Sequence, residues 1–385
     1  MKNITMLLFV FVSVVFFACG TPEPQPDQAL TVESTEIPHY IIAAVDTIGI
    51  ELGDSNYVFG QTDAALFGTR GEILVLDGSK KQISVFSPDG EFLRTIGRQG
   101  SGPGEFLRPM AMALLGNGQI AVSDPWGGKI TLFDSSYAYH DEITGFFPAP
   151  PLSIEGADGQ AIIGLMKKFD IENDLVGYAL ARLDGTAEPA YIYAEEMVTM
   201  EPTMIGPGYT ETTVAFASDI QGRVFTSTTS TDNYLINGFF PDGELFLEIQ
   251  LPYDAIAKTQ QEMDKEIEDF NTSLENRATS GGGGRMQGMG VQIPADELNY
   301  EPLPDHYAIS ELMIDPQERI WARRGSEPLP YFDVFDLEGE LLFTAAVEEG
   351  DPDSQDWTIV VGENNLLGFS SDPEGYPKVV ILILQ

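Results

Sequence analysis

Four glycines lie close together in the segment "GRQGSGPGEFLRP" at residues 97–109. A glycine-rich loop binds phosphate when a helix follows it at once, with Lys and then Ser or Thr at the helix start. Here Pro109 and an alternating apolar and polar stretch follow, and that Lys is missing. We therefore interpret the segment as a structural corner, where glycine permits a positive φ and close approach of two backbones.

The residue types that usually carry catalysis are few and scattered. A catalytic zinc site needs about three converging ligands, and the histidines are His39, His140 and His306. In the strand arrangement derived below these three do not meet, so we expect no histidine metal site. The G-x-S-x-G motif that presents a nucleophilic serine is also absent. The sequence predicts no catalytic residue.

One acidic stretch, "EEGDPDSQD" at 348–356, is a candidate calcium cluster. Calcium takes six to eight oxygen ligands, often from carboxylates. The favoured interpretation is a solvated acidic loop, so we expect neither a metal nor a cofactor and keep calcium as an open alternative. Its carboxylates are Glu348, Glu349, Asp351, Asp353 and Asp356.

The N-terminus has the pattern of a secretion signal. An apolar run from Met6 to Ala18 follows Lys2, and it is too short for a comfortable membrane span. Cys19, the only cysteine, comes directly after it. A small residue followed by Cys at this place resembles a bacterial lipobox, which implies a signal peptide at 1–18 and lipid on Cys19. The alternative is an ordinary signal peptide with an incidental cysteine. Residues 19–36, rich in Pro, Gln and acid, are typical of a flexible tether.

The charge excludes one class of partner. The chain of 385 residues has 60 acidic and 20 basic side chains, a formal net charge of −40. Nucleic-acid binding needs positive charge against the phosphates, so we expect no nucleic-acid partner. The acids are spread along the chain, which favours adaptation to a saline habitat over a dedicated cation-binding surface.

An internal repeat indicates the fold. Residues 71–86, "GEILVLDGSKKQISVF", match residues 118–133, "GQIAVSDPWGGKITLF", at a constant offset of 47. Each copy reads as a strand, a turn opened by an aspartate, and a second strand with half-buried alternation. Asp77 and Asp124 hold the same place in the two copies, so we assign them to turn capping and not to catalysis.

Weaker copies give six units of this kind. They begin near residues 156, 218, 314 and 360 and end in further strands. Four-stranded units of about 40–50 residues are the signature of a β-propeller. The last unit lacks a strand, and the early segment "HYIIAAVDTIGIEL" at 39–52 could complete it and close the ring.

The segment from Gly97 to Asp134 resembles the NHL-repeat consensus, and the whole chain resembles bacterial six-bladed β-propeller lipoproteins. The resemblance covers about residues 37–385 and implies an all-β propeller of six four-stranded antiparallel blades. It also implies that the glycine-rich corner joins two blades, with Phe106 in the seam. Between blades four and five, residues of about 253–300 predict an inserted helix and a glycine-rich linker. Ile256, Met263, Ile267, Phe270 and Leu274 form its apolar stripe, with Pro252 and Asp254 as start signals. Packing on the propeller is favoured over a lid.

A ligand site is expected at the mouth of the central channel, where loops from several blades converge. The favoured interpretation is a membrane-anchored, monomeric propeller of the cell envelope that binds an unknown protein or glycan without catalysis. The alternative is a calcium-dependent lactonase-like or lyase-like enzyme with channel carboxylates. The binding candidates, chosen because Arg and Trp concentrate binding energy, are Arg98, Trp126, Trp321, Arg323 and Arg324.

Overall fold

The computed structural model describes residues 37–170, 172–199, 214–228, 230–279, 302–373 and 375–385, with side chains of the helix as far as residue 272. Residues 37–385 form one compact unit. The predicted signal peptide, the tether, Cys19 and the glycine-rich linker of the insertion lie outside the described residues, as does the side chain of Leu274.

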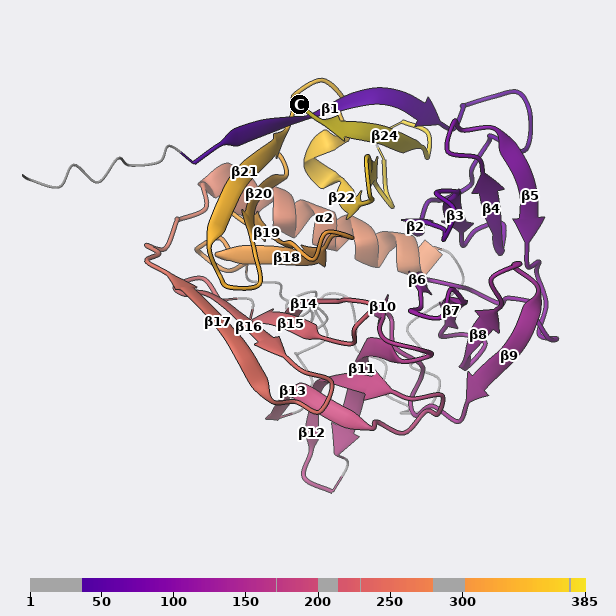
Figure 1. Ribbon diagram of the computed structural model, residues 1–385, viewed down its shortest axis with the longest axis horizontal. Coiled ribbons are helices and arrows are strands. Elements are labelled where there is room, and N and C mark those ends of the chain that lie inside the picture. Colours follow the sequence, from indigo (N-terminus) through magenta and orange to yellow (C-terminus); the bar gives the residue numbers. More distant parts are fainter. Residues whose placement is uncertain (1–36, 171, 200–213, 229, 280–301, 374) are drawn as a thin grey trace, which may run out of the picture. The chain divides into compact units, whose positions relative to one another are not determined.

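Four-stranded antiparallel blades stand around a central axis (Figure 1). In blades 1 to 5 the strands run in sequence order from the axis outward, whereas the outermost strand of blade 6 is the N-terminal strand. Blade 1 consists of β2 (Ala64–Phe67), β3 (Ile73–Asp77), β4 (Gln82–Phe86) and β5 (Phe92–Ile96). Blade 2 consists of β6 (Ala111–Leu114), β7 (Ile120–Asp124), β8 (Lys129–Phe133) and β9 (Tyr139–Thr144). Blade 3 consists of β10 (Ile154–Gly156), β11 (Ile162–Asp170), β12 (Leu175–Leu183) and β13 (Tyr191–Thr199).

The remaining blades complete the ring. Blade 4 consists of β14 (Val214–Ser218), β15 (Val224–Thr228), β16 (Tyr234–Phe239) and β17 (Leu245–Leu251). Blade 5 consists of β18 (Ile309–Ile314), β19 (Ile320–Arg324), β20 (Tyr331–Phe335) and β21 (Leu341–Val347). Blade 6 consists of β22 (Thr358–Val361), β23 (Leu366–Phe369), β24 (Val379–Leu384) and β1 (His39–Ile48). The predicted all-β propeller of six blades is confirmed.

The N-terminal strand closes the ring, as the sequence suggested. β1 pairs antiparallel with β24, from Ile42 opposite Leu384 to Ile48 opposite Val379. β1 also makes a second strand pairing, which the sequence did not indicate. Its first residues pair in parallel with β21 of blade 5, from His39 opposite Thr344 onward. Blades 5 and 6 therefore share one eight-stranded sheet.

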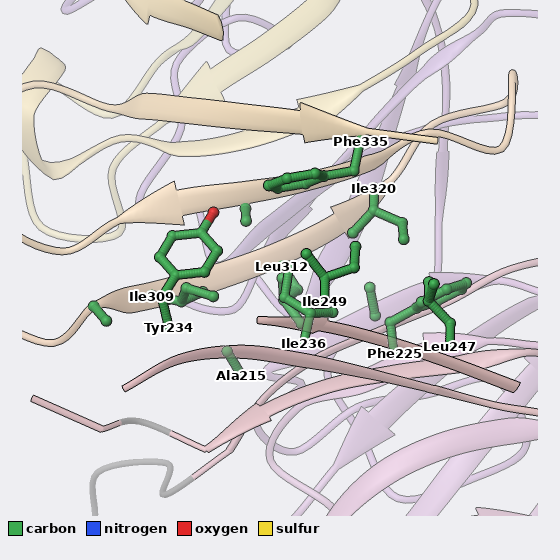
Figure 2. Packing of buried hydrophobic residues seen from close by; sticks show 13 residues of the cluster. Ala215, Phe225, Tyr234, Ile236, Leu247, Ile249, Ile309, Leu312, Ile320 and Phe335 are labelled. Atoms are coloured by element: carbon green, nitrogen blue, oxygen red, sulfur yellow. The ribbon is translucent and has the colours of Figure 1, made fainter. Parts of the chain in front are cut away.

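Neighbouring blades pack face to face through apolar side chains. Figure 2 shows the cluster between blades 4 and 5, where Phe225 and Ile236 meet Ile309, Leu312 and Phe335. Similar clusters lie between blades 1 and 2 and between blades 5 and 6. Each blade has such a seam on both faces, so its strands are rich in buried branched and aromatic residues.

The glycine-rich corner joins β5 to β6 and no helix follows it, which agrees with the structural interpretation. Gly97 has φ of 72°, and a Cβ there would lie 2.3 Å from the Phe106 ring. Phe106 is fully buried in the cluster between blades 1 and 2, with its ring 6.0 Å from that of Phe133. Gly97 therefore permits both the turn and the ring that fills the seam.

The two repeated aspartates cap turns, as predicted, and also tie blades together. Asp77 accepts the Lys80 amide of its own turn at 2.9 Å, and Asp124 accepts the Gly127 amide at 2.9 Å. The second oxygen of Asp77 accepts the amide of Gly60, at 2.8 Å. The second oxygen of Asp124 accepts the amide of Leu107, at 2.6 Å. Both donors lie in the connection that enters the blade, so each buried carboxylate fixes a turn and an incoming chain together.

The inserted helix is present between blades 4 and 5, but its start differs from the prediction. α2 spans Gln260–Thr279, so Pro252, Asp254 and Ile256 precede it. The start is set by a capping box. The Thr259 amide donates to the Glu262 carboxylate at 2.6 Å, and the Glu262 amide donates to the Thr259 hydroxyl at 3.3 Å. Within the expected stripe Phe270 is buried, whereas Ile267 is exposed.

The closing role of β1 can be tested at one residue. Ile42 is fully buried and belongs to the core between blades 5 and 6. Ile42→Ala removes apolar contacts from this core, and we expect the free energy of unfolding to fall by about 3 kcal/mol. Denaturant unfolding of the two proteins measures this difference.

The matched control is the neighbouring Ile41→Ala, because Ile41 is 39% exposed. We expect less than about 1 kcal/mol there. Equal losses at the two positions would show that β1 does not act as a buried closing strand.

Candidate ligand channel

The central channel holds a cavity of about 830 Å³ to which all six blades contribute. Its wall is mainly apolar and comes from the inner strands, with Leu66, Met112, Ile314 and Val361 among its residues. Its mouth is formed by turns that join each inner strand to the second strand of the blade. Small-molecule sites are typically concave, apolar and of this size, with a few polar groups that orient the ligand.

Two mouth turns share an Asp-x-Gln-x-Arg motif that the sequence analysis missed. Asp219 and Asp315 each accept the backbone amides two and four residues later, all at 2.9–3.0 Å. Each also accepts Nε of the arginine that ends the motif, Arg223 at 2.5 Å and Arg319 at 2.6 Å. The motif makes each turn rigid and leaves its arginine paired.

The mouth arginines are all neutralised by local acids. Arg223 also reaches Glu318 of the next blade at 3.1 Å, which links blades 4 and 5. Arg70 pairs with Glu72 at 2.5 Å. Ile220, between Asp219 and Gln221, is 65% exposed on the rim. An entering ligand therefore meets paired arginines, the exposed Glu363 of the β22–β23 turn and the exposed side chain of Ile220.

Glu155 of β10 is an unusual residue in the cavity lining. It lies one residue before the Gly156–Ile162 pair that closes the first hairpin of blade 3. The equivalent hairpin pairs identify the same position in the other blades, and all five residues there are apolar. They are Leu66, Ala113, Ala217, Met313 and Val360. A carboxylate at this position is therefore not required by the blade.

The surroundings of Glu155 disfavour its charged form. Water reaches the side chain through the channel, yet protein encloses it. Burial, with a smaller repulsion from Glu311, raises the pKa of Glu155 to about 7. Within the described part of the chain, its carboxylate has neither an ion pair nor a hydrogen bond to another side chain.

Glu311 of β18 lies two residues before Met313, in the next layer of side chains along the channel. Unlike Glu155, it has a cation: Arg323 Nη1 lies 3.4 Å from its carboxylate. Burial still raises the pKa of Glu311, and Arg323 opposes that rise. Arg323 also donates to the carbonyls of Trp357 and Gln355, at 2.8 and 2.9 Å.

The predicted binding residues are dispersed, and their role in binding stays a prediction. Arg323 is the one that approaches the channel carboxylates. Arg324, next to it, makes a bidentate pair with Asp333 at 2.7 and 2.9 Å. Trp321 is 1% exposed and donates to Asp315 at 2.8 Å, so it is a core residue.

The other two candidates lie away from the channel lining. Trp126, in the β7–β8 turn, is 58% exposed, and the Arg108 guanidinium stacks 4.5 Å above its ring. Arg98 is largely exposed and pairs with Glu105 at 2.7 Å.

The candidate calcium loop already contains a cation. Lys378 Nζ lies 2.8 Å from Asp351 and 3.4 Å from Asp353. The histidines lie in separate places: His39 beside Thr344, His140 in β9, and His306 near Glu262 of the insertion. Across the described ranges, no three or more His, Cys, Asp and Glu side chains gather as a metal site would require.

Comparison with known proteins supports the architecture. Residues 55–158 match a family model, DUF5128, described as a 6-bladed β-propeller. No curated protein matches. In the described residues, no helix is long and apolar enough to cross a membrane.

Solved structures are similar in fold. A Bacteroides fragilis protein described as exported has 12% identity and a TM-score of 0.47, over 90% of this chain and 96% of that one. A virginiamycin B lyase from Staphylococcus aureus has 11% identity and a TM-score of 0.43, over 90% and 100%. A gluconolactonase from Xanthomonas campestris has 13% identity and a TM-score of 0.41, over 91% and 99%. These values are too low to transfer an activity.

The environment of Glu155 predicts a pH-dependent effect on stability. Its pKa is about 7 in the fold against 4.5 as the ordinary value, so the folded state holds the proton more tightly. The fold therefore loses stability as pH rises from about 4.5 to 7, and the loss stays constant above that. A fully sheltered group would cost about 3 kcal/mol, but channel water screens this one. We expect Glu155→Gln to raise the free energy of unfolding by about 1 kcal/mol at pH 8.

Denaturant unfolding of both proteins at pH 4.5 and pH 8 measures the effect, which should nearly vanish at pH 4.5. The matched control is Glu188→Gln, because Glu188 is exposed and outside the channel. An equal change in the free energy of unfolding at both pH values would show that the ionisation of Glu155 does not cause the effect.

Proposed function

We propose that this protein is a non-catalytic binding module of the bacterial cell envelope, with its ligand held in the central channel. The observation that carries this is the cavity of about 830 Å³, to which every blade contributes. An apolar wall, a mouth held by ion pairs and an unpaired carboxylate on an inner strand are the features of a site that binds and orients a small molecule. A protein or glycan partner would then present a side chain or sugar to the same mouth.

The alternative is a calcium-dependent lactonase-like or lyase-like enzyme. Glu155 favours it, because it places a carboxylate in the channel wall, and Glu311 lies near enough to repel that carboxylate. Calcium takes six to eight oxygen ligands, however, and Arg323 already neutralises Glu311. Binding therefore explains the described geometry better than metal-assisted catalysis.

Attachment to a membrane belongs to the same proposal. The lipobox-like Cys19 after the apolar run from Met6 to Ala18 supports a lipid anchor, and residues 19–36 would act as the tether. The resemblance to NHL-type lipoprotein propellers supports the same location. The net charge of −40 supports a soluble, monomeric propeller without nucleic-acid partners.

A melting screen tests the channel. Residues 20–385 are heated with a library of amines, acids, sugars and peptides, and with millimolar calcium, all in fixed high sodium chloride. A channel ligand raises the free energy of unfolding by about 2.7 kcal/mol at a hundredfold excess over Kd. We expect an organic ligand to do so, and calcium to add nothing beyond the general salt effect.

The controls are two tryptophan variants. Glu155→Trp fills the channel and should abolish the shift, whereas Glu188→Trp, at an exposed site outside it, should keep the shift. No stabilisation by any class of compound would contradict a channel ligand. Stabilisation specific to calcium, with reproducible hydrolysis of a lactone or ester, would establish the enzyme instead.

The anchor is tested by Cys19→Ser. Without the thiol no lipid can be attached, so we expect the variant to leave the membrane fraction and appear in the soluble one. Fractionation with detection by antibody measures this, and Ser13→Ala within the apolar run is the control that should stay in the membrane fraction. Membrane association of Cys19→Ser equal to that of the parent would contradict lipidation.

A further inference from the structure

The charge inside the channel indicates what kind of ligand it takes. Glu155 lies in the cavity wall and has no cationic partner in the described chain, whereas the mouth arginines Arg70, Arg223 and Arg319 are each paired with acids. The side chain of Glu155 is exposed to the channel, and a carboxylate there without a partner is free to pair with a cationic ligand. The five equivalent positions show that an apolar residue is compatible with the blade. The carboxylate is therefore best explained by something that enters the channel.

The neighbouring charges strengthen this conclusion. β10 packs against β6, β11 and β14, and neither β6 nor β14 has a titratable side chain. On β11, Lys167, Lys168 and Asp170 lie at least four residues beyond Ile163, the partner of Glu155. Glu311 of β18 is the titratable group that acts on Glu155 across the channel, and Arg323 compensates it. Among the described lining residues, the carboxylates without a cationic partner are Glu155 on β10 and Glu363 in the β22–β23 turn at the mouth. Of these two, Glu155 is the one on an inner strand.

The wall limits the rest of the ligand. Leu66, Met112 and Ile314 line the cavity, and Ile220 is exposed at its mouth. An apolar body gains free energy from such a wall, and the field of a protein with net charge −40 concentrates cations at a low-dielectric cleft. A hydrated divalent ion would gain nothing from the apolar wall and, on the described inner strands, would find one free carboxylate, that of Glu155.

We propose that the channel binds an organic cation, with an ammonium or guanidinium group paired to Glu155 and an apolar body against the inner strands. This inference rests on the proposed binding function and names its ligand class. Binding to the ionised carboxylate competes with its proton, so affinity rises with pH. With half-ionisation near pH 7, the apparent affinity should be about tenfold higher at pH 8 than at pH 6.

The experiment compares three probes with the same chain length on the purified chain: n-hexylammonium, hexan-1-ol and hexanoate. Hexylammonium keeps its charge at both pH values, since alkyl ammonium groups titrate near pH 10, as lysine does. Calorimetry or ligand-observed NMR at pH 6 and pH 8 gives the Kd values. We expect hexylammonium to bind at least tenfold more tightly than the other probes at pH 8, and about tenfold less tightly at pH 6 than at pH 8.

Variants assign the effect to one side chain. Glu155→Gln should lose at least tenfold in hexylammonium affinity and all of its pH dependence, with hexanol binding unchanged. Glu155→Asp keeps the charge, so it should recover part of the hexylammonium affinity and part of its pH dependence. Glu188→Gln should bind hexylammonium as the parent does. These comparisons separate a charge effect from a folding defect.

Other outcomes overturn the inference in distinct ways. Tighter binding of hexanol or hexanoate, or unchanged hexylammonium affinity in Glu155→Gln, would refute the cation while leaving channel binding in place. If calcium binds more tightly than hexylammonium, and if Glu155→Gln abolishes calcium binding, the channel is an ion site and the inference is wrong. Failure of all three probes would refute the inference, and the melting screen would then decide whether any other ligand uses the channel.

Discussion

Face-to-face packing of the blades around a closed ring is the constraint on which the rest of the molecule depends. Each blade buries apolar side chains against both neighbours, and Figure 2 shows one such seam. A ring with an open seam would expose two of these surfaces to water, at a cost that grows with the apolar area exposed. β1 removes this cost by completing blade 6, and its parallel pairing with β21 joins blade 6 to blade 5. The channel exists because the ring closes, and its wall is the set of inner strands that closure brings together.

Buried carboxylates then fix the loops that packing alone leaves free. Asp77 and Asp124 each hold a turn and an incoming connection, and Asp219 and Asp315 each hold a turn and an arginine. In every case the acid accepts several N–H groups, which compensates its burial. The mouth of the channel is consequently rigid, and the acidity of the chain is used structurally at these places. Glu155 differs because the described chain provides no such donors for it.

Much of the fold could be predicted because the sequence contains two clear copies of the repeat. The offset of 47 residues placed β3 and β4 on β7 and β8, and the shared Asp77 and Asp124 identified the turns. The helix start was misplaced because Pro252 and Asp254 are general start signals, whereas the Thr259–Glu262 capping box sets the observed one. The parallel pairing of β1 with β21 has no local sequence signal, since it depends on how two distant blades meet. Sequence reasoning also missed Glu155, because the repeat is eroded in blade 3 and one glutamate does not stand out in a chain with 60 acidic side chains.

Glu155 is identified by its position in the strand register, because its residue type alone does not distinguish it. Aligning the six inner strands on their hairpin pairs gives a column of apolar residues with one acid. A structural role would favour the residue that the other five blades use, because an apolar side chain loses less on burial than a carboxylate does. Selection for solubility acts on the outer surface, which is where the surplus acids of a strongly acidic chain are useful. Neither pressure explains an unpaired acid in a mainly apolar cavity wall, so Glu155 is best explained by a ligand whose positive charge pairs with it.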